Sequence, residues 1–358
     1  MGYAPQMQPP VPDFEPPLTP ALVIDLDAVD HNVAAVLARA GGPGRWRPHV
    51  KTVKSQAVIA RLLAAGVHCL KVATVPELEL VLEAAESHGA SIDVLVAYPL
   101  RGSAVEAVEA LARRHAGARI HLLADDPAHL NELRATGLPL FLDVDLGMGR
   151  TGTPPEDWRG VSTDGVSGLH GYDGHHTWTE RQAAHAGYDR LCALADALGV
   201  SGLDVITSGT HSYAHALDHE GLQTGPWRAQ ISPGTVVLSD TRTAPAAADL
   251  GLRQAAWVVS RAVSVRGDRV TLDAGSKALS PDARPSGVAP AHPDWAWHGP
   301  SEEHQPCRGE GVCAGSLVWL VPTHVCTTVN LYREAWFSRS GAIVTRQHIG
   351  AAGRALVV

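Results

Sequence analysis

Two lysines, Lys51 and Lys54, lie in one short segment of a chain that otherwise hardly uses lysine. Only four of the 29 lysines and arginines among its 358 residues are lysines. Arginine can replace lysine in an ion pair, but it cannot form a Schiff base, because its guanidinium group stays protonated. A lysine desolvated beside other cations has a lowered pKa and becomes a nucleophile toward carbonyls. The pattern therefore indicates Schiff-base chemistry at Lys51 ahead of Lys54; the alternative is a lysine ion-paired at the end of a strand.

Two clusters rich in glycine or small hydroxyl side chains have the composition of anion-binding loops. Residues 145–152 contain three glycines around Arg150, so a tight turn can present a fixed cation to a phenolate or carboxylate. The alternative is an ordinary turn whose arginine pairs with a surface aspartate. Residues 207–213 combine hydroxyl side chains with Gly209, a composition that can surround a phosphate after a late barrel strand. The alternative there is a loop that caps the next helix.

Two further clusters carry aromatic, imidazole and thiol groups. Tyr172, within residues 171–176, could stack on or hydrogen-bond to a planar cofactor; the adjacent His175 and His176 point apart and are weak evidence for a metal. His324 and Cys326 follow an apolar run, and on an extended chain positions i and i+2 face the same side. A thiolate with an imidazole selects zinc or a similar ion. A buried structural cysteine beside an unrelated histidine is the alternative.

The elements that must position these clusters change in character along the chain. Between about residues 21 and 240, short apolar runs alternate with amphipathic stretches, the first run being 21–25 and the last 204–207. Seven or eight such units, without a Gly-x-Gly-x-x-Gly turn, favour a closed (β/α)8 barrel. After about residue 240, β-rich runs at 256–265, 269–273 and 317–321 predict a second, mainly β domain. Residues 281–313 within it are loop-like.

The composition excludes several classes of protein. A net charge of −8 argues against nucleic acid or anionic membrane as a partner. No apolar run approaches the roughly 20 residues that span a bilayer. Residues 1–17 are rich in proline and lack the pattern of a signal peptide, so we expect a flexible arm. Five widely scattered cysteines give no disulfide framework, which favours the cytoplasm.

In order and spacing, five segments resemble the D-threonine aldolase and D-serine dehydratase family of fold-type III pyridoxal 5′-phosphate (PLP) enzymes: residues 19–25, 47–52, 147–152, 302–304 and 322–330. The resemblance runs from about residue 19 to 350. It implies an arm at 1–17, an alanine racemase-like PLP-binding (β/α)8 barrel at 18–240, and a C-terminal mainly β domain at 241–358 that carries a metal site. Residues 207–209 depart from the more glycine-rich phosphate loop of the family, and residues 281–313 look elaborated.

The resemblance also implies roles for individual residues. Lys51 forms the Schiff base with PLP, and Arg150 lies near the phenolic oxygen of the cofactor. His324 and Cys326 act with Lys51 in catalysis and bind a divalent metal, which we expect to be Zn²⁺, with Mn²⁺ or Mg²⁺ as alternatives. The remaining cofactor-binding residues are expected to be His49, Tyr172, Ser208, Gly209, Thr210, Ser212 and Tyr213.

The activity implied is that of a lyase on a small substrate, a D-configured β-hydroxy-α-amino acid, in a homodimer. The substrate is either dehydrated and deaminated or cleaved in a retro-aldol reaction, and the sequence does not separate the two. One alternative is an amino-acid racemase, which would need a second acid or base and would have no use for His324 and Cys326. The other is a non-catalytic PLP-binding protein, which would not need the residues that follow the barrel.

Overall fold

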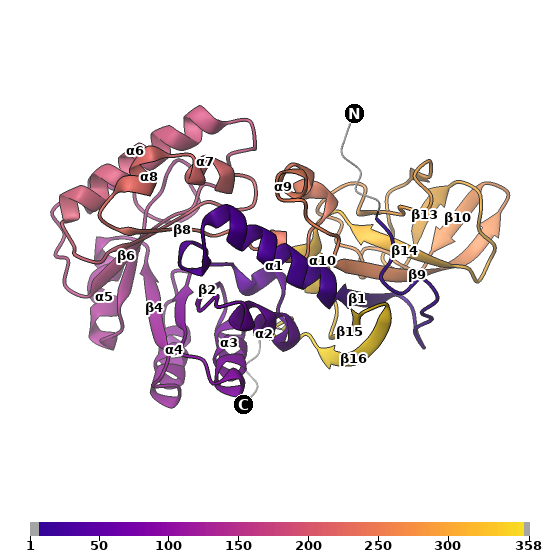
Figure 1. The fold of residues 1–358 in the computed structure, drawn as a ribbon, viewed down its shortest axis with the longest axis horizontal. Helices are drawn as coiled ribbons and strands as arrows, with labels where there is room; N and C mark the ends of the chain where they lie inside the picture. The colour runs from indigo at the N-terminus through magenta and orange to yellow at the C-terminus, as the bar shows by residue number, and fades with distance from the viewer. Residues whose placement is uncertain (1–6, 354–358) are drawn as a thin grey trace. The chain divides into compact units, whose positions relative to one another are not determined.

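The computed structural model describes residues 7–353 (Figure 1) and groups the chain into two compact units. The first, which we call the barrel unit, contains residues 36–51 and 62–234. The second, the β unit, contains the described residues up to 35 together with residues 52–61 and 235–353. Neither unit is one continuous stretch of the chain. This grouping does not test the predicted division into an arm, a barrel and a C-terminal domain at residues 17 and 240, which stays a prediction.

Seven parallel strands, which neighbour one another in chain order, form the sheet of the barrel unit. They are β2 (Cys69–Val72), β3 (Asp93–Val96), β4 (Arg119–Ala124), β5 (Leu140–Asp143), β6 (Val166–Gly171), β7 (Asp204–Thr207) and β8 (Arg228–Ile231). The helices between and after them are α3 (Val75–His88), α4 (Ser103–Arg114), α5 (Pro127–Leu133), α6 (Arg181–Leu198), α7 (Tyr213–Leu217) and α8 (Glu220–Thr224). Figure 1 shows helices packed outside these strands, as a βα alternation predicts.

A short segment preceding Lys51 lies between the first and last strands of this sheet. Trp46 forms a parallel bridge with Ile231 of β8, and His49 forms one with Lys71 of β2. The Arg47 amide donates to the Ile231 carbonyl at 2.9 Å, and the Lys71 amide donates to Pro48 at 3.0 Å. Residues 46–49 therefore occupy the eighth position and close the barrel. The sequence predicted neither this role nor strand β8.

Local signals explain where the barrel helices begin and end. The Thr74 hydroxyl accepts a hydrogen bond from the Glu77 amide at 3.3 Å, which satisfies a free donor in the first turn of α3. Gly89 ends that helix at φ 67°, a left-handed conformation that glycine adopts without a steric penalty. Asp126 caps α5 in the same way by accepting from the His129 amide at 2.8 Å. Both helices follow a strand in the chain, as the predicted alternation of apolar runs and amphipathic stretches requires.

The β unit is built around a mixed sheet in the order β12-β13-β10-β9-β1-β15-β16, with β14 also pairing with β9 and with β11. Its strands are β1 (Ala21–Asp25), β9 (Ala256–Arg266), β10 (Arg269–Leu272), β11 (Gly287–Val288), β12 (Ala296–Trp297), β13 (Gln305–Arg308), β14 (Leu317–Pro322), β15 (Glu334–Arg339) and β16 (Ala342–His348). Its short helices are α9 (Ala244–Leu250) and α10 (Val325–Val329), while α1 (Leu26–Ala40) and α2 (Gln56–Ala64) contribute residues to both units. The predicted mainly β character of this part is confirmed.

Strand β1 belongs to this sheet rather than to the barrel strands that follow it in the sequence. It pairs antiparallel with β9 and parallel with β15. Leu22, Val23 and Ile24 are at most 1% exposed, and the backbone N–H and C=O groups of a buried strand must be hydrogen-bonded, so this strand needs a neighbour along each edge. β9 and β15 supply those neighbours. Val23 packs with Trp257 and Trp319 in the core of the β unit.

The segments expected to be irregular are partly ordered. Residues 281–313 contain β11, β12 and β13, and Trp295 is 7% exposed with its ring stacked on His292 at 4.3 Å. Residues 1–6 of the predicted flexible arm at 1–17 lie outside the described residues. In the described part of the arm, Phe14 packs edge-on against Trp336, with the ring centres 5.3 Å apart.

No helix in residues 7–353 has the length and apolar character needed to cross a bilayer.

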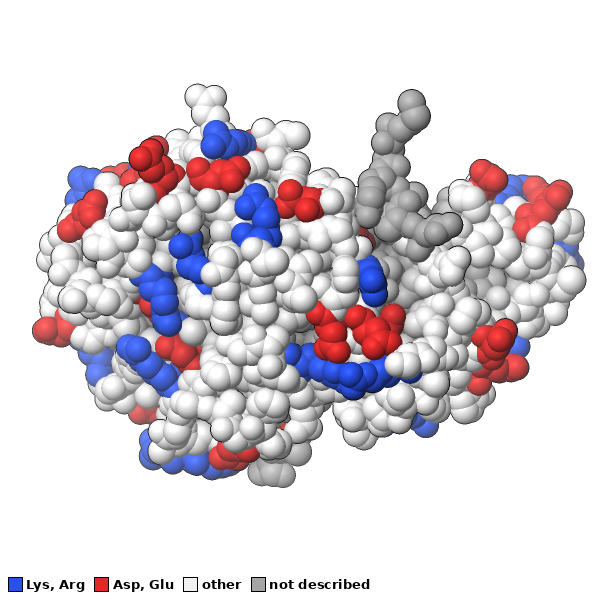
Figure 2. All heavy atoms as spheres, in the orientation of Figure 1, with Lys and Arg blue, Asp and Glu red and all other residues white. Residues whose placement is uncertain are grey.

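Charged side chains are distributed without a dominant sign on the face that Figure 2 shows. Lys and Arg side chains lie beside Asp and Glu side chains in small groups separated by uncharged surface. This face therefore offers no extended field of either sign.

Candidate cofactor and metal sites

Three buried polar side chains form a hydrogen-bonded chain across strands β2, β6 and β5 of the barrel unit. Lys71 Nζ lies 3.4 Å from His170 Nε2, and His170 Nδ1 lies 2.9 Å from Asp143 Oδ1. All three residues are at most 3% exposed. They stand near the carboxyl ends of their strands, where barrel active sites lie.

The surroundings of this chain are rich in cations. Burial, then Lys51, then Arg150 hold the pKa of Lys71 well below its usual range. Burial and the neighbouring Lys51 and Lys71 likewise hold the pKa of His49 well below its usual value. Burial works to raise the pKa of Asp143, but the His170 hydrogen bond keeps it below the usual range. One carboxylate therefore faces several cations, a balance that favours binding of an anion.

Lys51 differs from the sequence-based expectation in one respect. We expected a desolvated lysine, but Lys51 is exposed in a one-turn helix at Val50–Thr52, and Lys71 is the desolvated one. The other two lysines have structural partners. Lys54 donates to the Ala351 carbonyl at 2.9 Å, and Lys277 pairs with Glu302 at 2.7 Å. The assignment of the Schiff base to Lys51 rather than Lys54 stays a prediction, and Lys71 was not among the predicted site residues. Its signal was the scarcity of lysine itself.

The loop that presents Arg150 is shaped by the aspartate that precedes it. Asp145 Oδ1 accepts hydrogen bonds from the amides of Gly147 at 2.9 Å and Gly149 at 3.1 Å. Gly152 adopts φ 87°, and a Cβ there would lie 2.8 Å from the Asp143 carbonyl oxygen, so only glycine fits. The turn leaves Arg150 exposed, with its guanidinium carbon 4.7 Å from the centre of the Tyr172 ring.

Tyr172 connects this loop to the predicted phosphate loop. A Cβ at Gly174 would lie 2.3 Å from the Tyr172 ring, and one at Gly209 would lie 3.2 Å from it, so both glycines make room for the aromatic side chain. The Lys71 ammonium is 5.7 Å from the ring centre, on a ring that also contacts Arg150. The structure therefore brings Tyr172, Arg150 and Gly209 together, while their contacts with a cofactor stay predictions.

Ser208 is the most distinctive residue of the phosphate loop. It adopts φ 65°, and its hydroxyl is buried without a hydrogen-bond partner in the described part of the chain. A buried hydroxyl without a partner costs free energy, and a phosphate oxygen would satisfy it. Together with the unbalanced cations nearby, this donor fits an anionic cofactor that carries a phosphate.

Other predicted residues of this loop have structural contacts. The Ser212 hydroxyl donates to Asp173 Oδ1 at 2.7 Å and accepts from the Gly209 amide at 3.1 Å. Tyr188 donates to the second oxygen of the same buried carboxylate. Tyr213 is 1% exposed and packs edge-on against Trp178, and Thr210 is also buried. The cofactor contacts assigned to Thr210, Ser212 and Tyr213 stay predictions.

The predicted metal ligands lie in the β unit. His324 Nδ1 is 2.5 Å from Asp282 Oδ2, and its ring shares a hydrogen bond with the Cys326 thiol, which with Asp282 raises the pKa of His324 to about 9. Burial works to raise the pKa of Cys326, but hydrogen bonds from His324, Thr235 and Thr52 lower it. The Thr52 and Thr235 hydroxyls lie 3.1 and 3.3 Å from the sulfur. A thiolate beside an imidazole is a donor set that suits zinc.

The local geometry that brings His324 and Cys326 together is not the predicted one. Cys326 lies in helix α10, which begins at Val325, so the extended-chain argument was wrong. The helix starts here because the Val325 amide donates to the buried Asp240 carboxylate at 3.0 Å. No group of three or more His, Cys, Asp or Glu side chains in residues 7–353 has the arrangement of a metal site. The pair with Asp282 is therefore a partial donor set.

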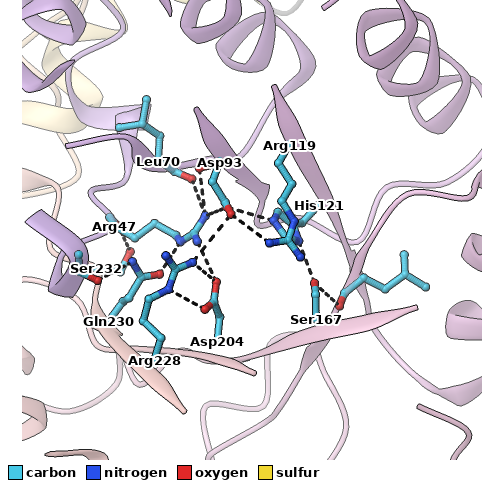
Figure 3. A network of polar contacts seen from close by, with 12 residues as sticks. Arg47, Leu70, Asp93, Arg119, His121, Ser167, Asp204, Arg228, Gln230 and Ser232 are labelled. Atoms are coloured by element: carbon cyan, nitrogen blue, oxygen red, sulfur yellow. Dashed lines mark hydrogen bonds and ion pairs between the residues drawn. The ribbon is translucent and has the colours of Figure 1, made fainter. Parts of the chain in front are cut away.

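A second buried polar network lies at the opposite, amino-terminal ends of the barrel strands (Figure 3). Arg47 is fully buried and donates to Asp93 at 2.6 Å while its second Nη contacts Asp204 at 3.2 Å. Arg228 donates to Asp204 at 2.7 Å, and His121 Nε2 lies 3.0 Å from Asp93. Arg47 and Arg228 pair with Asp93 and Asp204, and the largely exposed Arg119 lies 3.9 Å from Asp93. Each carboxylate of this network therefore has arginine partners, and the network needs no ligand.

Comparison with known proteins matches both parts of the chain. Residues 24–171 match the family model for the alanine racemase N-terminal domain, and residues 252–337 match that for a putative serine dehydratase domain. The chain is 27% identical to a D-threonine aldolase of Arthrobacter sp, over 94% of this chain and 93% of the relative. It is 32% identical to D-threo-3-hydroxyaspartate dehydratase of Delftia sp. (strain HT23), over 39% of this chain and 37% of the relative.

The fold is likewise shared with solved structures. The crystal structure of D-threonine aldolase from Filomicrobium marinum superposes with a TM-score of 0.76 at 24% identity, covering 94% of this chain and 96% of that one. The fold is thus an alanine racemase-type barrel with an additional mainly β domain. These matches support the resemblance to the fold-type III family of D-threonine aldolase and D-serine dehydratase that the motifs indicated.

Proposed function

We propose that this protein is a PLP- and divalent metal-dependent lyase acting on a D-configured β-hydroxy-α-amino acid. The observation that carries the proposal is the cation-rich cluster at the carboxyl ends of the barrel strands, where Lys51 and Arg150 accompany a buried Ser208 hydroxyl that has no hydrogen-bond partner within residues 7–353. The relatives support the substrate class, because D-threonine and D-threo-3-hydroxyaspartate both carry an amino group next to a hydroxyl-bearing carbon.

The barrel residues would divide the work of holding the cofactor. Lys51 would hold it covalently through its amine, and Ser208 would donate a hydrogen bond to the phosphate. Arg150 would balance negative charge beside Tyr172. When bound, PLP supplies an electron sink for charge developing at the substrate Cα. Lys51, once its amine is released, can also take up a proton as a general base.

The residues of the β unit would hold the metal. His324 and Cys326 supply a nitrogen and a sulfur donor, and Asp282 lies against His324. This set favours Zn²⁺ over Mn²⁺ or Mg²⁺, which prefer oxygen donors. The metal would supply Lewis acidity toward the β-hydroxyl of the substrate. A racemase would need none of these groups, so the His324–Cys326 pair speaks against that alternative.

Two reactions of this class each have a supporting observation. Retro-aldol cleavage is supported by the aldolase match over 94% of the chain. Dehydration is supported by the match of residues 252–337 to a serine dehydratase model. We further propose a homodimer located in the cytoplasm; the five unpaired cysteines support a reducing compartment. Light scattering of the purified protein tests the dimer.

Product analysis tests the reaction. Purified enzyme supplemented with zinc is incubated with D-threonine, D-serine and D-threo-3-hydroxyaspartate, and glycine, aldehyde, keto acid and ammonia are assayed together. Glycine with an aldehyde identifies an aldolase, and keto acid with ammonia identifies a dehydratase. The Lys51→Ala variant should lose activity and the visible absorbance of lysine-bound cofactor, whereas Lys277→Ala, a change at an exposed ion pair, should lose neither. Full activity in Lys51→Ala would refute the proposal.

The metal role is tested separately. Cys326→Ser should retain the cofactor absorbance but lose bound metal and metal-dependent turnover. Cys313→Ser, at an exposed cysteine, is the matched control and should change neither. If Cys326→Ser and a chelator both leave turnover intact, the metal role is wrong.

A further inference from the structure

Lys71 is a second lysine of the cofactor cluster, and its amine uses only part of its hydrogen-bonding capacity. The residue is 2% exposed, and its hydrogen-bond partner in the described part of the chain is His170, at 3.4 Å. Even a neutral amine has two N–H donors, so at least one donor of Lys71 has no hydrogen-bond acceptor within residues 7–353. A buried donor in this state is costly unless a ligand supplies an acceptor.

The hydrogen-bond chain fixes how Lys71 is oriented. Asp143 accepts from the Thr151 hydroxyl at 2.8 Å and lies 2.9 Å from His170 Nδ1. Because an ionised carboxylate only accepts, His170 Nδ1 must carry the proton, which leaves Nε2 as an acceptor. Lys71 therefore donates one N–H to Nε2. Asp143 and His170 thus hold the amine in place, and the Asp143 carboxylate acts on the amine through His170.

The groups around Lys71 carry more positive than negative charge. The neighbouring segment 46–51 supplies His49, Lys51 and Arg47, the last of which is already paired with Asp93 and Asp204. Strand β5 supplies Asp143 and the following loop supplies Arg150. Strand β6 and its end supply His170 and Tyr172. Asp143 is the single carboxylate among these groups, and it is engaged by His170 and Thr151. An oxyanion would offset both the surplus charge and the unused donors.

We propose that Lys71 is an oxyanion-binding residue of this site, positioned by His170 and Asp143, and that oxyanion binding is coupled to proton uptake by Lys71. The inference rests on the proposed function and adds to it a residue outside the predicted set. The oxyanion is the phenolic oxygen of the cofactor or the carboxylate of the substrate. Proton uptake follows because burial and neighbouring cations disfavour the charged amine until an anion is present.

Calorimetry on the full-length protein freed of cofactor tests the coupling. The probe is pyridoxine 5′-phosphate, which carries the phosphate and phenolic oxygen but no aldehyde, so Lys51 does not react with it. Titrations at pH 8 in two buffers of different ionisation enthalpy give the number of protons taken up. If the phenolic oxygen is the anion, Lys71→Met should reduce this number by up to about one proton and weaken binding about 10-fold. His170→Phe should reduce it in the same direction, while Lys277→Met should match the wild type.

A second arm distinguishes the substrate carboxylate. With cofactor bound, the affinity for D-serine and for its carboxyl-free amino alcohol is measured by spectral titration. If the carboxylate is the anion, Lys71→Met weakens D-serine binding about 10-fold, leaves the amino alcohol unaffected, and leaves the pyridoxine 5′-phosphate titration unchanged. Lys71→Gln, which keeps a polar side chain, checks that lost packing is not the cause.

The outcomes separate this inference from the proposed function. If wild-type protein binds no pyridoxine 5′-phosphate, the proposed cofactor site is wrong. If it binds the probe but folded Lys71→Met and Lys71→Gln equal the wild type in both arms, Lys71 binds no oxyanion and the inference is overturned.

Discussion

The two ends of the barrel contain buried polar clusters that differ in how their charges are balanced. At the amino-terminal ends, Arg47 is held between Asp93 and Asp204, and Arg228 also pairs with Asp204 (Figure 3). At the carboxyl ends, Lys71 contacts the neutral His170, and the single carboxylate of that cluster, Asp143, contacts His170 rather than the Lys71 amine.

This difference in charge balance distinguishes a network that stabilises the fold from one whose charges a bound ligand would balance. Arg47 and Lys71 are both almost fully buried, so burial of a cation by itself identifies neither function. At the balanced end, hydrogen bonds from His121 and Arg47 overcome burial and keep the pKa of Asp93 below its usual range. At the unbalanced end, burial and neighbouring cations both lower the pKa of Lys71. Unbalanced charge, rather than buried charge, marks the candidate site.

Breaking the balanced network should give the largest effect. Arg47→Met leaves Asp93 and Asp204 short of a partner, and we expect a loss of about 3–5 kcal/mol in the free energy of unfolding. Urea denaturation of the ligand-free protein measures it. Arg228→Met, at a side chain 42% exposed, should cost less. An Arg47→Met protein as stable as the wild type would show that this network does not stabilise the barrel.

The unbalanced end should respond to pH in a way that depends on ligand. Burial and Lys71 lower the pKa of His170, so this histidine stays neutral in the folded state while the unfolded state takes up a proton below about pH 6.5. Its contribution to stability is thus complete above pH 6.5 and falls with decreasing pH, by at most about 1.4 kcal/mol per pH unit. His170→Asn should flatten this dependence between pH 6.5 and 5.5.

Repeating this measurement with a bound anionic ligand makes the test specific to the carboxyl-terminal end of the barrel strands. Bound pyridoxine 5′-phosphate offsets the cations around His170 and should reduce the part of the pH dependence that His170→Asn removes. The part due to His121, whose pKa is lowered by burial despite Asp93, should not change. Equal ligand effects on both histidines, measured by urea denaturation across pH, would erase the distinction between the two ends.

Removing the unbalanced cation should have the opposite sign to removing Arg47. Lys71→Met deletes a desolvated amine whose hydrogen-bond partner within residues 7–353 is a histidine and not a carboxylate. The ligand-free protein should therefore be as stable as the wild type or more stable by roughly 1 kcal/mol. Thermal unfolding without cofactor measures this. A loss of several kcal/mol would place Lys71 among the structural residues, with Arg47.

The sequence predicted the elements of the fold better than their partners. Helix α3 was recognisable from Pro76 and its amphipathic pattern, because caps and periodicity are local signals. Closure of the barrel by residues 46–49 was not, since Pro48 interrupts a strand pattern and the pairing reaches Ile231. The pairing of β1 with β15 likewise joins segments some three hundred residues apart.

The candidate site shows the same division. Lys51 and Arg150 lie in motifs that the family resemblance identified. Lys71 and His170 lie within strands, where an isolated polar residue gives no local signal, and only their mutual distance across the sheet shows that they act together. A residue's counter-charge is supplied by other segments, so charge balance cannot be deduced along the chain.

A matched pair of serines gives the smallest and most specific test. Ser232, which directly follows β8, donates to the Arg47 carbonyl at 2.7 Å, whereas the buried hydroxyl of Ser208 has no acceptor within residues 7–353. Ser232→Ala should therefore cost the ligand-free protein about 0.5–1 kcal/mol, and Ser208→Ala should cost nothing or stabilise it slightly. With pyridoxine 5′-phosphate the order reverses: Ser208→Ala should weaken binding several-fold, and Ser232→Ala should not. Denaturation and calorimetry on the two variants measure both effects, and a stability loss at Ser208 without a loss of affinity would assign its hydroxyl to the fold instead of the ligand.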